Sequence, residues 1–170
     1  NAIFSFLIDL PTNTVFHFEL AGRLLDEETI ALLSRAPKGR FQFEIGVQST
    51  YAETLRACGR SDDWPRLRAY LADLMERTSI PVHLDLIAGL PHEGFDRFAR
   101  SFDEVAALRP DRLQLGFLKL IPGSVLRARA EEYSILYRDE PPYEVLSTDA
   151  LSFGELCRLH DIEDMLERFG

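Results

Sequence analysis

Polar side chains alternate with bulky apolar ones along the segment RFQFEIGVQST, residues 40–50. This alternation predicts a β-strand. Its polar positions are an acid, a glycine and two amides: Gln42, Glu44, Gly46 and Gln48. A strand of an α/β sheet is normally buried on both faces, so these groups need partners. A ligand is one candidate, because a glycine lets another molecule approach the backbone. A buried polar network is the other, and this strand alone does not decide between them.

Four such strands alternate with amphipathic segments. The predicted strands are residues 14–20, 40–50, 80–90 and 112–120, after a helix tail at 2–10. The predicted helices are 24–36, 50–60, 95–108 and 125–132, together with a longer one that contains Trp64 to Leu74. Strands alternating with helices predict an α/β fold with a parallel sheet and right-handed crossovers. Residues 137–143 are expected to form a loop, and 151–169 a helix in two pieces around His160.

Two helix starts have specific signals. The acidic triplet that begins at Asp26 suits a helix N-terminus. Thr50 with Glu53 three residues later matches a capping box. Both patterns are interpreted as structural, and neither is taken as a metal site.

Polar or backbone-exposing residues end every predicted strand. They are Glu19, then Gln48 and Ser49, then Ala88 to Pro91, then Lys119, Pro122 and Gly123. In a parallel sheet these ends share one edge, where α/β enzymes bind their ligands. Turns occur at this edge in any α/β protein, so a rim without function is the alternative. The coincidence at four strands favours a ligand site.

Composition narrows the function further. The chain has 170 residues, 46% of them hydrophobic, which is enough to bury one good core. A formal net charge of -9 argues against nucleic-acid binding. No apolar run approaches the ~20 residues of a membrane span and no signal peptide is evident, so we expect a cytoplasmic protein. The chain begins at Asn1 inside an amphipathic segment, so we also expect a truncated part of a longer protein.

The strings FEIGVQS, ETLRACGR, LDLIAGLPHE and LQLGFLKLIPGS resemble the second half of the radical S-adenosylmethionine (SAM) core. The resemblance is closest to the cobalamin-binding radical SAM proteins, often labelled Fe-S oxidoreductases, and to the oxygen-independent coproporphyrinogen oxidases. It covers about Thr14 to Ser124, and PPYEVLST is similar to the C-terminal extension of the cobalamin group. It implies a partial (β/α) TIM-type barrel in residues 1–124, with the four strands as the third to sixth of six, and a helical extension packed on it in 125–170.

The resemblance also implies a cofactor site for SAM. The implied cofactor-binding residues are Glu19, Glu44, Gln48, Arg60, Asp85, Ile87 and Gly89. Glu44 and Gln48 are implied near the ribose and methionyl groups, and the segment from Ile87 to Gly89 beside the adenine. Arg60 resembles an arginine that meets the carboxylate of SAM, which a guanidinium binds bidentately. Lys119 is implied to face the substrate.

One departure limits the activity expected of this chain. The family holds a [4Fe–4S] cluster with the thiolates of a CxxxCxxC loop, and the cluster binds SAM. This chain has only Cys58 and Cys157, which we expect to be buried small hydrophobes. We therefore expect no metal site and no activity of the chain alone. The parent would use SAM, a [4Fe–4S] cluster, a small-molecule substrate and, through an upstream domain, cobalamin.

His17 and His83 could be core or substrate-facing residues, and we favour the core.

Three functions remain open at this point. The first is part of a radical SAM Fe-S oxidoreductase, which FEIGVQS and IAGLP together favour. The second is an iron-free (β/α) barrel enzyme, and the third a non-catalytic α/β scaffold that binds a protein partner. The strand edge at 14–20 would be exposed in a partial barrel, so we also expect a homodimer that approximates a closed eight-stranded barrel.

Overall fold

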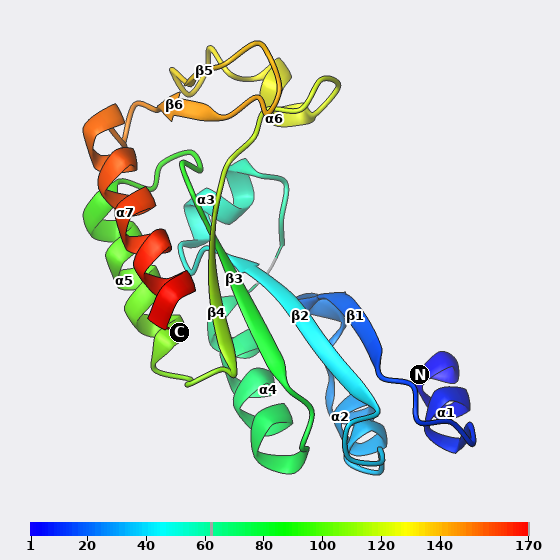
Figure 1. Cartoon of the computed structure of the whole chain (residues 1–170). Helices are drawn as coiled ribbons and strands as arrows, with labels where there is room; N and C mark the ends of the chain where they lie inside the picture. Colours follow the sequence, from blue (N-terminus) through cyan, green and yellow to red (C-terminus); the bar gives the residue numbers. More distant parts are fainter. Residues whose placement is uncertain (62, 170) are drawn as a thin grey trace.

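The computed structural model describes residues 1–61 and 63–169, so Gly170, the last residue of the predicted extension, lies outside the described part. Four parallel strands form one sheet in the order β1-β2-β3-β4 (Figure 1). The strands are β1 (Phe16–Ala21), β2 (Phe41–Gln48), β3 (Val82–Ala88) and β4 (Arg112–Phe117). The connections contain the short helix η1 (Gly22–Leu24) with α2 (Glu27–Leu33), then α3 (Ala52–Ala57) with α4 (Trp64–Arg77), then α5 (Phe95–Ala106). The predicted α/β class is confirmed.

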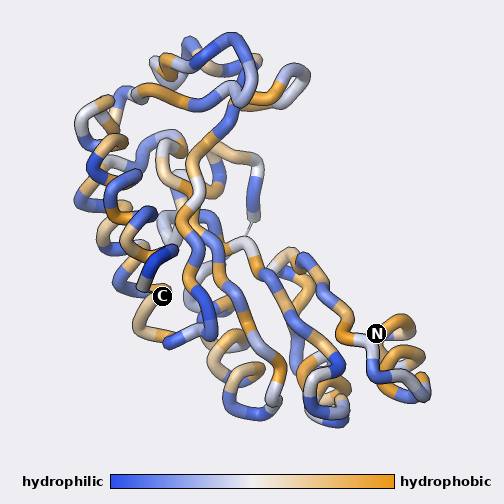
Figure 2. Tube along the Cα trace, in the orientation of Figure 1, coloured by the Kyte–Doolittle hydropathy of each residue, from blue (hydrophilic) through white to orange (hydrophobic). Residues whose placement is uncertain are grey.

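One face of the sheet is apolar and fully buried. Phe43, Ile45 and Leu84 are all 0% exposed. The buried residues of α2, α4 and α5 that join them in one core include Ile30, Leu33, Leu71, Leu74, Phe98 and Val105. Colours change repeatedly between hydrophobic and hydrophilic along the strands (Figure 2). Burying a side chain of this size contributes roughly 1.5–3 kcal/mol, so this face provides most of the stability of the sheet.

Helix α1 (Ala2–Asp9) extends the apolar face beyond β1. The ring of Phe4 lies 5.3 Å from that of Phe18 and 5.6 Å from that of Phe41. Arg40 fixes the end of the helix, because its guanidinium donates to the backbone carbonyls of Leu10 and Thr12, both at 2.8 Å. The homodimer expected through the β1 edge stays a prediction.

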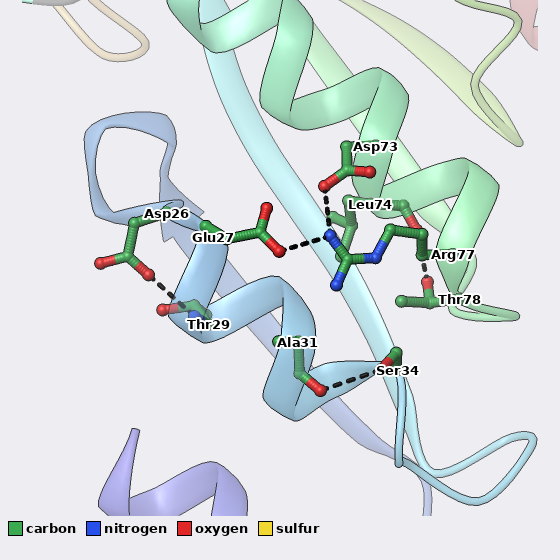
Figure 3. Close-up of polar contacts among 9 residues, drawn as sticks. All are labelled: Asp26, Glu27, Thr29, Ala31, Ser34, Asp73, Leu74, Arg77 and Thr78. Carbon is green, nitrogen blue, oxygen red and sulfur yellow. Dashed lines mark hydrogen bonds and ion pairs between the residues drawn. The ribbon is translucent and has the colours of Figure 1, made fainter.

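Figure 3 shows polar contacts of α2 and α4 on the outside of the sheet. The Asp26 carboxylate accepts a hydrogen bond of 2.8 Å from the backbone N–H of Thr29, which confirms the helix start predicted there. Arg77 lies 2.7 Å from Glu27 and 2.8 Å from Asp73, and so links the two helices. Pairs as exposed as these contribute about 0–1 kcal/mol each.

The C-terminal region contains one shortened helix and one strand pair that was not predicted. The helix predicted at 125–132 is only α6 (Val125–Ala128), because the following turns bury Tyr133 and Ile135. The loop predicted at 137–143 is confirmed apart from Tyr137, and it joins a short antiparallel pair that was not predicted, β5 (Leu136–Tyr137) with β6 (Val145–Ser147), beyond the carboxyl ends of the strands (Figure 1). The division of the chain at residue 124 stays a prediction.

The last helix, α7 (Phe153–Phe169), is continuous, and the predicted break at His160 is wrong. The imidazole of His160 stacks on Phe117 of β4 at 3.5 Å and lies 3.0 Å from the Glu144 carboxylate, so this polar position is held by tertiary contacts. A capping box starts the helix, since Ser152 N–H donates to Glu155 at 2.8 Å and Glu155 N–H donates to the Ser152 hydroxyl at 3.4 Å.

Candidate functional site

The second face of the sheet is polar. Its residues alternate with the buried ones: His17 and Glu19 on β1, Gln42, Glu44, Gly46 and Gln48 on β2, His83, Asp85 and Ile87 on β3, and Arg112, Gln114 and Gly116 on β4. The register places Glu19 beside Glu44 and Asp85 beside Gln114. We name this surface the polar face. Two clefts lie along it, and all of these residues except His17, Gln42 and His83 line one or both of them.

The two clefts adjoin each other. The first, of about 310 Å³, is lined by Glu19, Leu20, Ala21, Glu44, Gly46, Gln48, Arg60 and Asp85. The second, of about 340 Å³, shares Glu44, Gln48 and Asp85 with it and extends over β4 to Glu163, Leu166 and Glu167 of α7. The C-terminal helix therefore covers part of the polar face, and Figure 1 shows α7 beside β4.

Gly46 lets two polar groups meet at the first cleft. A Cβ on Gly46 would lie 2.2 Å from Nε2 of Gln48, so the Gln48 side chain folds back across the glycine. The backbone permits this because β2 has a register shift between these residues and Gln48 has a φ of 68°. Arg60 also donates to the carbonyl of Gly46 at 3.0 Å. An amide and a guanidinium are thus anchored around one backbone position.

Carboxylates dominate the charge of the polar face. Partial burial raises the pKa of Asp85 above its ordinary value, and the neighbouring Glu44 and Glu19 carboxylates act in the same direction. A hydrogen bond of 2.9 Å from the amide of Gln114 opposes this by stabilising the ionised form. His17 lies 3.5 Å from Glu44. Such a surface suits a ligand with hydroxyl or ammonium donors.

The structure brings most of the predicted site residues together. The first cleft holds Glu19, Glu44, Gln48, Arg60 and Asp85, which come from three strands and the segment after α3. Ile87 lines the second cleft. The roles assigned to these residues stay predictions, because the geometry shows their positions only.

Two predicted site residues lie outside both clefts. Gly89, with a φ of 86°, is buried, and a Cβ placed on it would lie 3.6 Å from Val145 and 3.8 Å from Leu156. It therefore lies beneath the C-terminal extension. Lys119 is exposed, and its backbone forms a bridge to Glu144.

The prediction that His17 and His83 lie in the core is wrong for both. His17 is exposed and His83 is half-buried, and both lie on the polar face. The amide nitrogen of Gln42 lies 3.2 Å from a ring nitrogen of His83. The alternating pattern contained this information, because His17 occupies the same face as Glu19 and His83 the same face as Asp85.

A second polar cluster lies behind the rim and was not predicted. Both the Ser49 and the Ser101 hydroxyl donate to Oε1 of Glu93, at 2.7 Å and 2.6 Å. Thr50 belongs to this cluster, because its hydroxyl lies 3.1 Å from that of Ser101 and accepts from Arg97 at 2.6 Å. The predicted capping box at Thr50 is therefore wrong. Its hydroxyl is engaged by α5, and Tyr51 is the residue that precedes the first turn of α3.

The cysteines do not form a cluster site. Cys58 is half-buried at the end of α3, and burial raises the pKa of its thiol to about 11. Cys157 is exposed on α7, so its predicted burial is wrong. Within residues 1–61 and 63–169, no group of three or more His, Cys, Asp or Glu side chains is placed to hold a metal ion. The same residues include no helix that is both long and apolar enough to cross a lipid bilayer.

Curated relatives of this chain are oxygen-independent coproporphyrinogen III oxidases. The anaerobic coproporphyrinogen III oxidase 1 of Cereibacter sphaeroides is 27% identical over 140 residues, which is 82% of this chain and 30% of the relative. The oxygen-independent coproporphyrinogen III oxidase of Pseudomonas aeruginosa is 34% identical over 100 residues, 59% of this chain and 21% of the relative. The chain thus spans less than a third of the curated relatives it matches. A family model described as "Protein of unknown function (DUF4080)" matches residues 131–169.

Solved structures show the same fold. Coproporphyrinogen III oxidase from Escherichia coli, a radical SAM enzyme, aligns with a TM-score of 0.63 and 22% identity over 89% of this chain and 32% of that one. The methyltransferase TsrM from Kitasatospora setae, solved with cobalamin and a [4Fe-4S] cluster bound, aligns with a TM-score of 0.64 and 15% identity over 89% of this chain and 31% of that one. The resemblance to radical SAM proteins and the partial TIM-type barrel are confirmed.

Proposed function

We propose that this chain is the C-terminal part of the barrel of a radical SAM Fe-S oxidoreductase. It is a homologue of the oxygen-independent coproporphyrinogen III oxidases, and it has the fold of part of a radical SAM barrel. In this proposal it carries part of the SAM site. One observation carries the proposal. Five residues to which the resemblance gives contacts with SAM line a single cleft at the carboxyl ends of the strands: Glu19, Glu44, Gln48, Arg60 and Asp85.

The chemistry of the first cleft fits SAM. The cosubstrate has a positive sulfonium and ammonium, hydroxyls on its ribose and one carboxylate. Glu19, Glu44 and Asp85 can accept from the ammonium and the hydroxyls, and their charge favours a cationic ligand. The Arg60 guanidinium can bind the carboxylate bidentately. In the second cleft Ile87 gives an apolar wall and Gly116 an open backbone, which suit the adenine. Gly89 shapes the turn beyond, and Lys119, which lines neither cleft, faces the substrate from the rim.

The residues of this chain do not fit an iron-sulfur cluster. Cys58 and Cys157 lack the CxxxCxxC spacing, and a thiol with a raised pKa is a poor source of the thiolate ligand that a cluster needs. We propose that the cluster, and cobalamin through a further domain, belong to other parts of the parent protein. The chain alone is then inactive. In the parent, a reduced cluster would supply the one electron that cleaves bound SAM to methionine and a 5′-deoxyadenosyl radical.

The substrate of the parent is a small molecule in this proposal. The curated relatives are named for coproporphyrinogen III, which is one. The second cleft, beneath α7, lies next to the proposed SAM site and shares Glu44, Gln48 and Asp85 with it. A substrate at the α7 end of this cleft, beyond the position proposed for the adenine, would lie beside the cosubstrate that reacts with it.

The proposal is tested on the full-length protein that contains this chain, purified without oxygen. We expect about four irons per chain, acid-labile sulfide, and 5′-deoxyadenosine after reductant and SAM are added. Arg60→Lys keeps the charge but loses the planar fork, so it should weaken SAM binding about tenfold. Arg56→Lys is the matched control, because Arg56 is exposed on the neighbouring helix α3 and lines neither cleft. Absence of iron and of SAM cleavage would contradict the proposal and favour the iron-free barrel.

A further inference from the structure

Glu93 is a buried acid whose presence the stability of the fold does not explain. It is 1% exposed, and burial raises the pKa of its carboxyl group. Its Oε1 accepts from two seryl hydroxyls, whereas Oε2 has no hydrogen-bond partner among the described residues. A buried polar atom without a partner costs about 1–3 kcal/mol. A well-packed apolar side chain would avoid this cost, so the buried carboxylate points to a role other than stability.

The hydrogen bonds of Glu93 join three elements at the rim. Ser49 follows β2, Glu93 lies in the turn after β3, and Ser101 lies in α5. The same hydroxyls also hold the backbone beyond β2, because Tyr51 N–H donates to Ser49 at 2.9 Å and Thr50 N–H donates to Ser101 at 3.3 Å. The peptide that follows Gln48 is therefore fixed from two directions.

Gln48 needs such support. Its φ of 68° is in the left-handed region, which costs a residue other than glycine roughly 1–2 kcal/mol. A strained conformation persists only where the surroundings hold it. Gln48 is paired with Leu86 of β3 just after the register shift, and the backbone N–H of Ser49 donates to the carbonyl of Val47 at 2.9 Å. The side-chain support comes from the following residue, Ser49, whose hydroxyl donates to Glu93 at 2.7 Å.

We propose that Glu93 is a positioning residue, which through Ser49 holds Gln48 in its left-handed conformation and so fixes the Gln48 amide in the SAM cleft. The inference rests on the proposed function, since it takes Gln48 as a ligand of SAM. Glu93 lines neither cleft, so it acts without touching the cosubstrate.

Three variants separate positioning from general stability. Glu93→Leu removes the acceptor of both hydroxyls, and Glu93→Gln restores one carbonyl oxygen for them. Thr54→Val is the matched control. Thr54 is 0% exposed and donates to the carbonyl of Pro91 at 2.8 Å, so this variant removes a buried hydrogen bond from the same turn without touching Ser49.

Two measurements are made on the full-length protein, reconstituted without oxygen: the dissociation constant for SAM by equilibrium dialysis, and amide hydrogen exchange of peptides that span residues 47–52. Glu93→Leu should weaken SAM binding about tenfold and speed up exchange in 47–52, because small displacements of a binding group cost this much. Glu93→Gln should stay within about twofold of the wild type. Thr54→Val should change neither quantity, although it too lowers thermal stability.

Equal losses of SAM affinity in Glu93→Leu and Thr54→Val would overturn the inference, since Glu93 would then only stabilise the turn. Unchanged exchange of 47–52 in Glu93→Leu would overturn it as well. The proposed function fails in a different way. If the wild type binds no SAM but exchange in 47–52 still responds to Glu93→Leu and not to Thr54→Val, Gln48 is held by Glu93 for another ligand.

Discussion

The two faces of the sheet come from the same strands but differ in almost every physical respect. Neighbours on β2 show this most clearly. Phe43 is 0% exposed and packs among aromatic rings, whereas 29% of the Glu44 side chain is exposed and faces both clefts. Successive side chains of a strand point to opposite faces, so one strand can build a core and a site at once.

Stability and ligand binding therefore depend on opposite faces of the same sheet. Substitutions on the apolar face should change the free energy of unfolding, and those on the polar face should change ligand affinity. The cluster around Glu93 is the exception, because it is polar but buried, and so supports the site from behind.

The apolar face should respond most strongly. Phe43→Ala removes a fully buried ring that lies 5.9 Å from the ring of Phe41, and should lower the free energy of unfolding by about 3–5 kcal/mol. Glu44→Gln, the adjacent residue on the other face, should change it by less than about 0.5 kcal/mol. Chemical denaturation of both variants beside the wild type measures the difference. Similar losses in the two variants would break the distinction between the faces.

Gly46→Ala should have the opposite profile. The new methyl group would meet the end of the flexible Gln48 side chain and not the backbone, so the free energy of unfolding should change by less than about 1 kcal/mol. The Gln48 amide must move away, however, and SAM affinity of the full-length protein should fall about tenfold. Gly154→Ala is the control, since a Cβ there meets nothing within 4 Å. An unchanged affinity in Gly46→Ala would mean that Gln48 does not contact the ligand.

The features of the fold and of the site that the sequence predicts are those with a local signal in the chain. Alternation over residues 40–50 is enough to assign a strand and both of its faces. Parallel strands end at one edge, so Glu19 and Gln48 were expected near each other, and the first cleft contains both. The assignment of SAM to that edge came from the resemblance of whole strings, which carry more information than any single residue.

The parts that were missed depend on contacts distant in sequence. Ser49 and Glu93 are 44 residues apart, and no local pattern pairs them. Thr50 could cap α3 or bond to α5, and only the tertiary structure selects the second. The strands β5 and β6 have two and three residues, too few to show an alternation. The helix continues through His160 because the imidazole stacks on Phe117. The sequence alone does not show this contact, so the polar residue suggested a break.

A smaller, pH-dependent effect should come from Asp85. Its pKa in the folded state is raised above the ordinary value of 3.8, first by burial, so the folded protein holds the proton more tightly than the unfolded chain. The free energy of unfolding therefore falls as the pH rises from about 3.8 to the folded pKa, and stays lower above it. Asp85→Asn cannot titrate and should lack this loss.

Denaturation curves between pH 3.5 and 8 test this, with an expected difference of less than about 1 kcal/mol because the side chain is partly exposed. Gln114→Leu sharpens the test. It removes the hydrogen bond that lowers the pKa of Asp85, so the window over which stability falls should extend to higher pH. Parallel pH profiles of Asp85→Asn and the wild type would show that Asp85 titrates alike in the folded and unfolded chains.

The smallest effect is expected at Lys119, which tests where the polar site ends. Its side chain is exposed and lines neither cleft, and its link to the rest of the fold is a backbone bridge to Glu144 that a substitution preserves. Lys119→Ala should change the free energy of unfolding by less than about 0.5 kcal/mol and leave SAM affinity unchanged. If Lys119 faces the substrate, only the Michaelis constant for that substrate should rise. A loss of SAM affinity in this variant would instead extend the SAM site past the carboxyl end of β4.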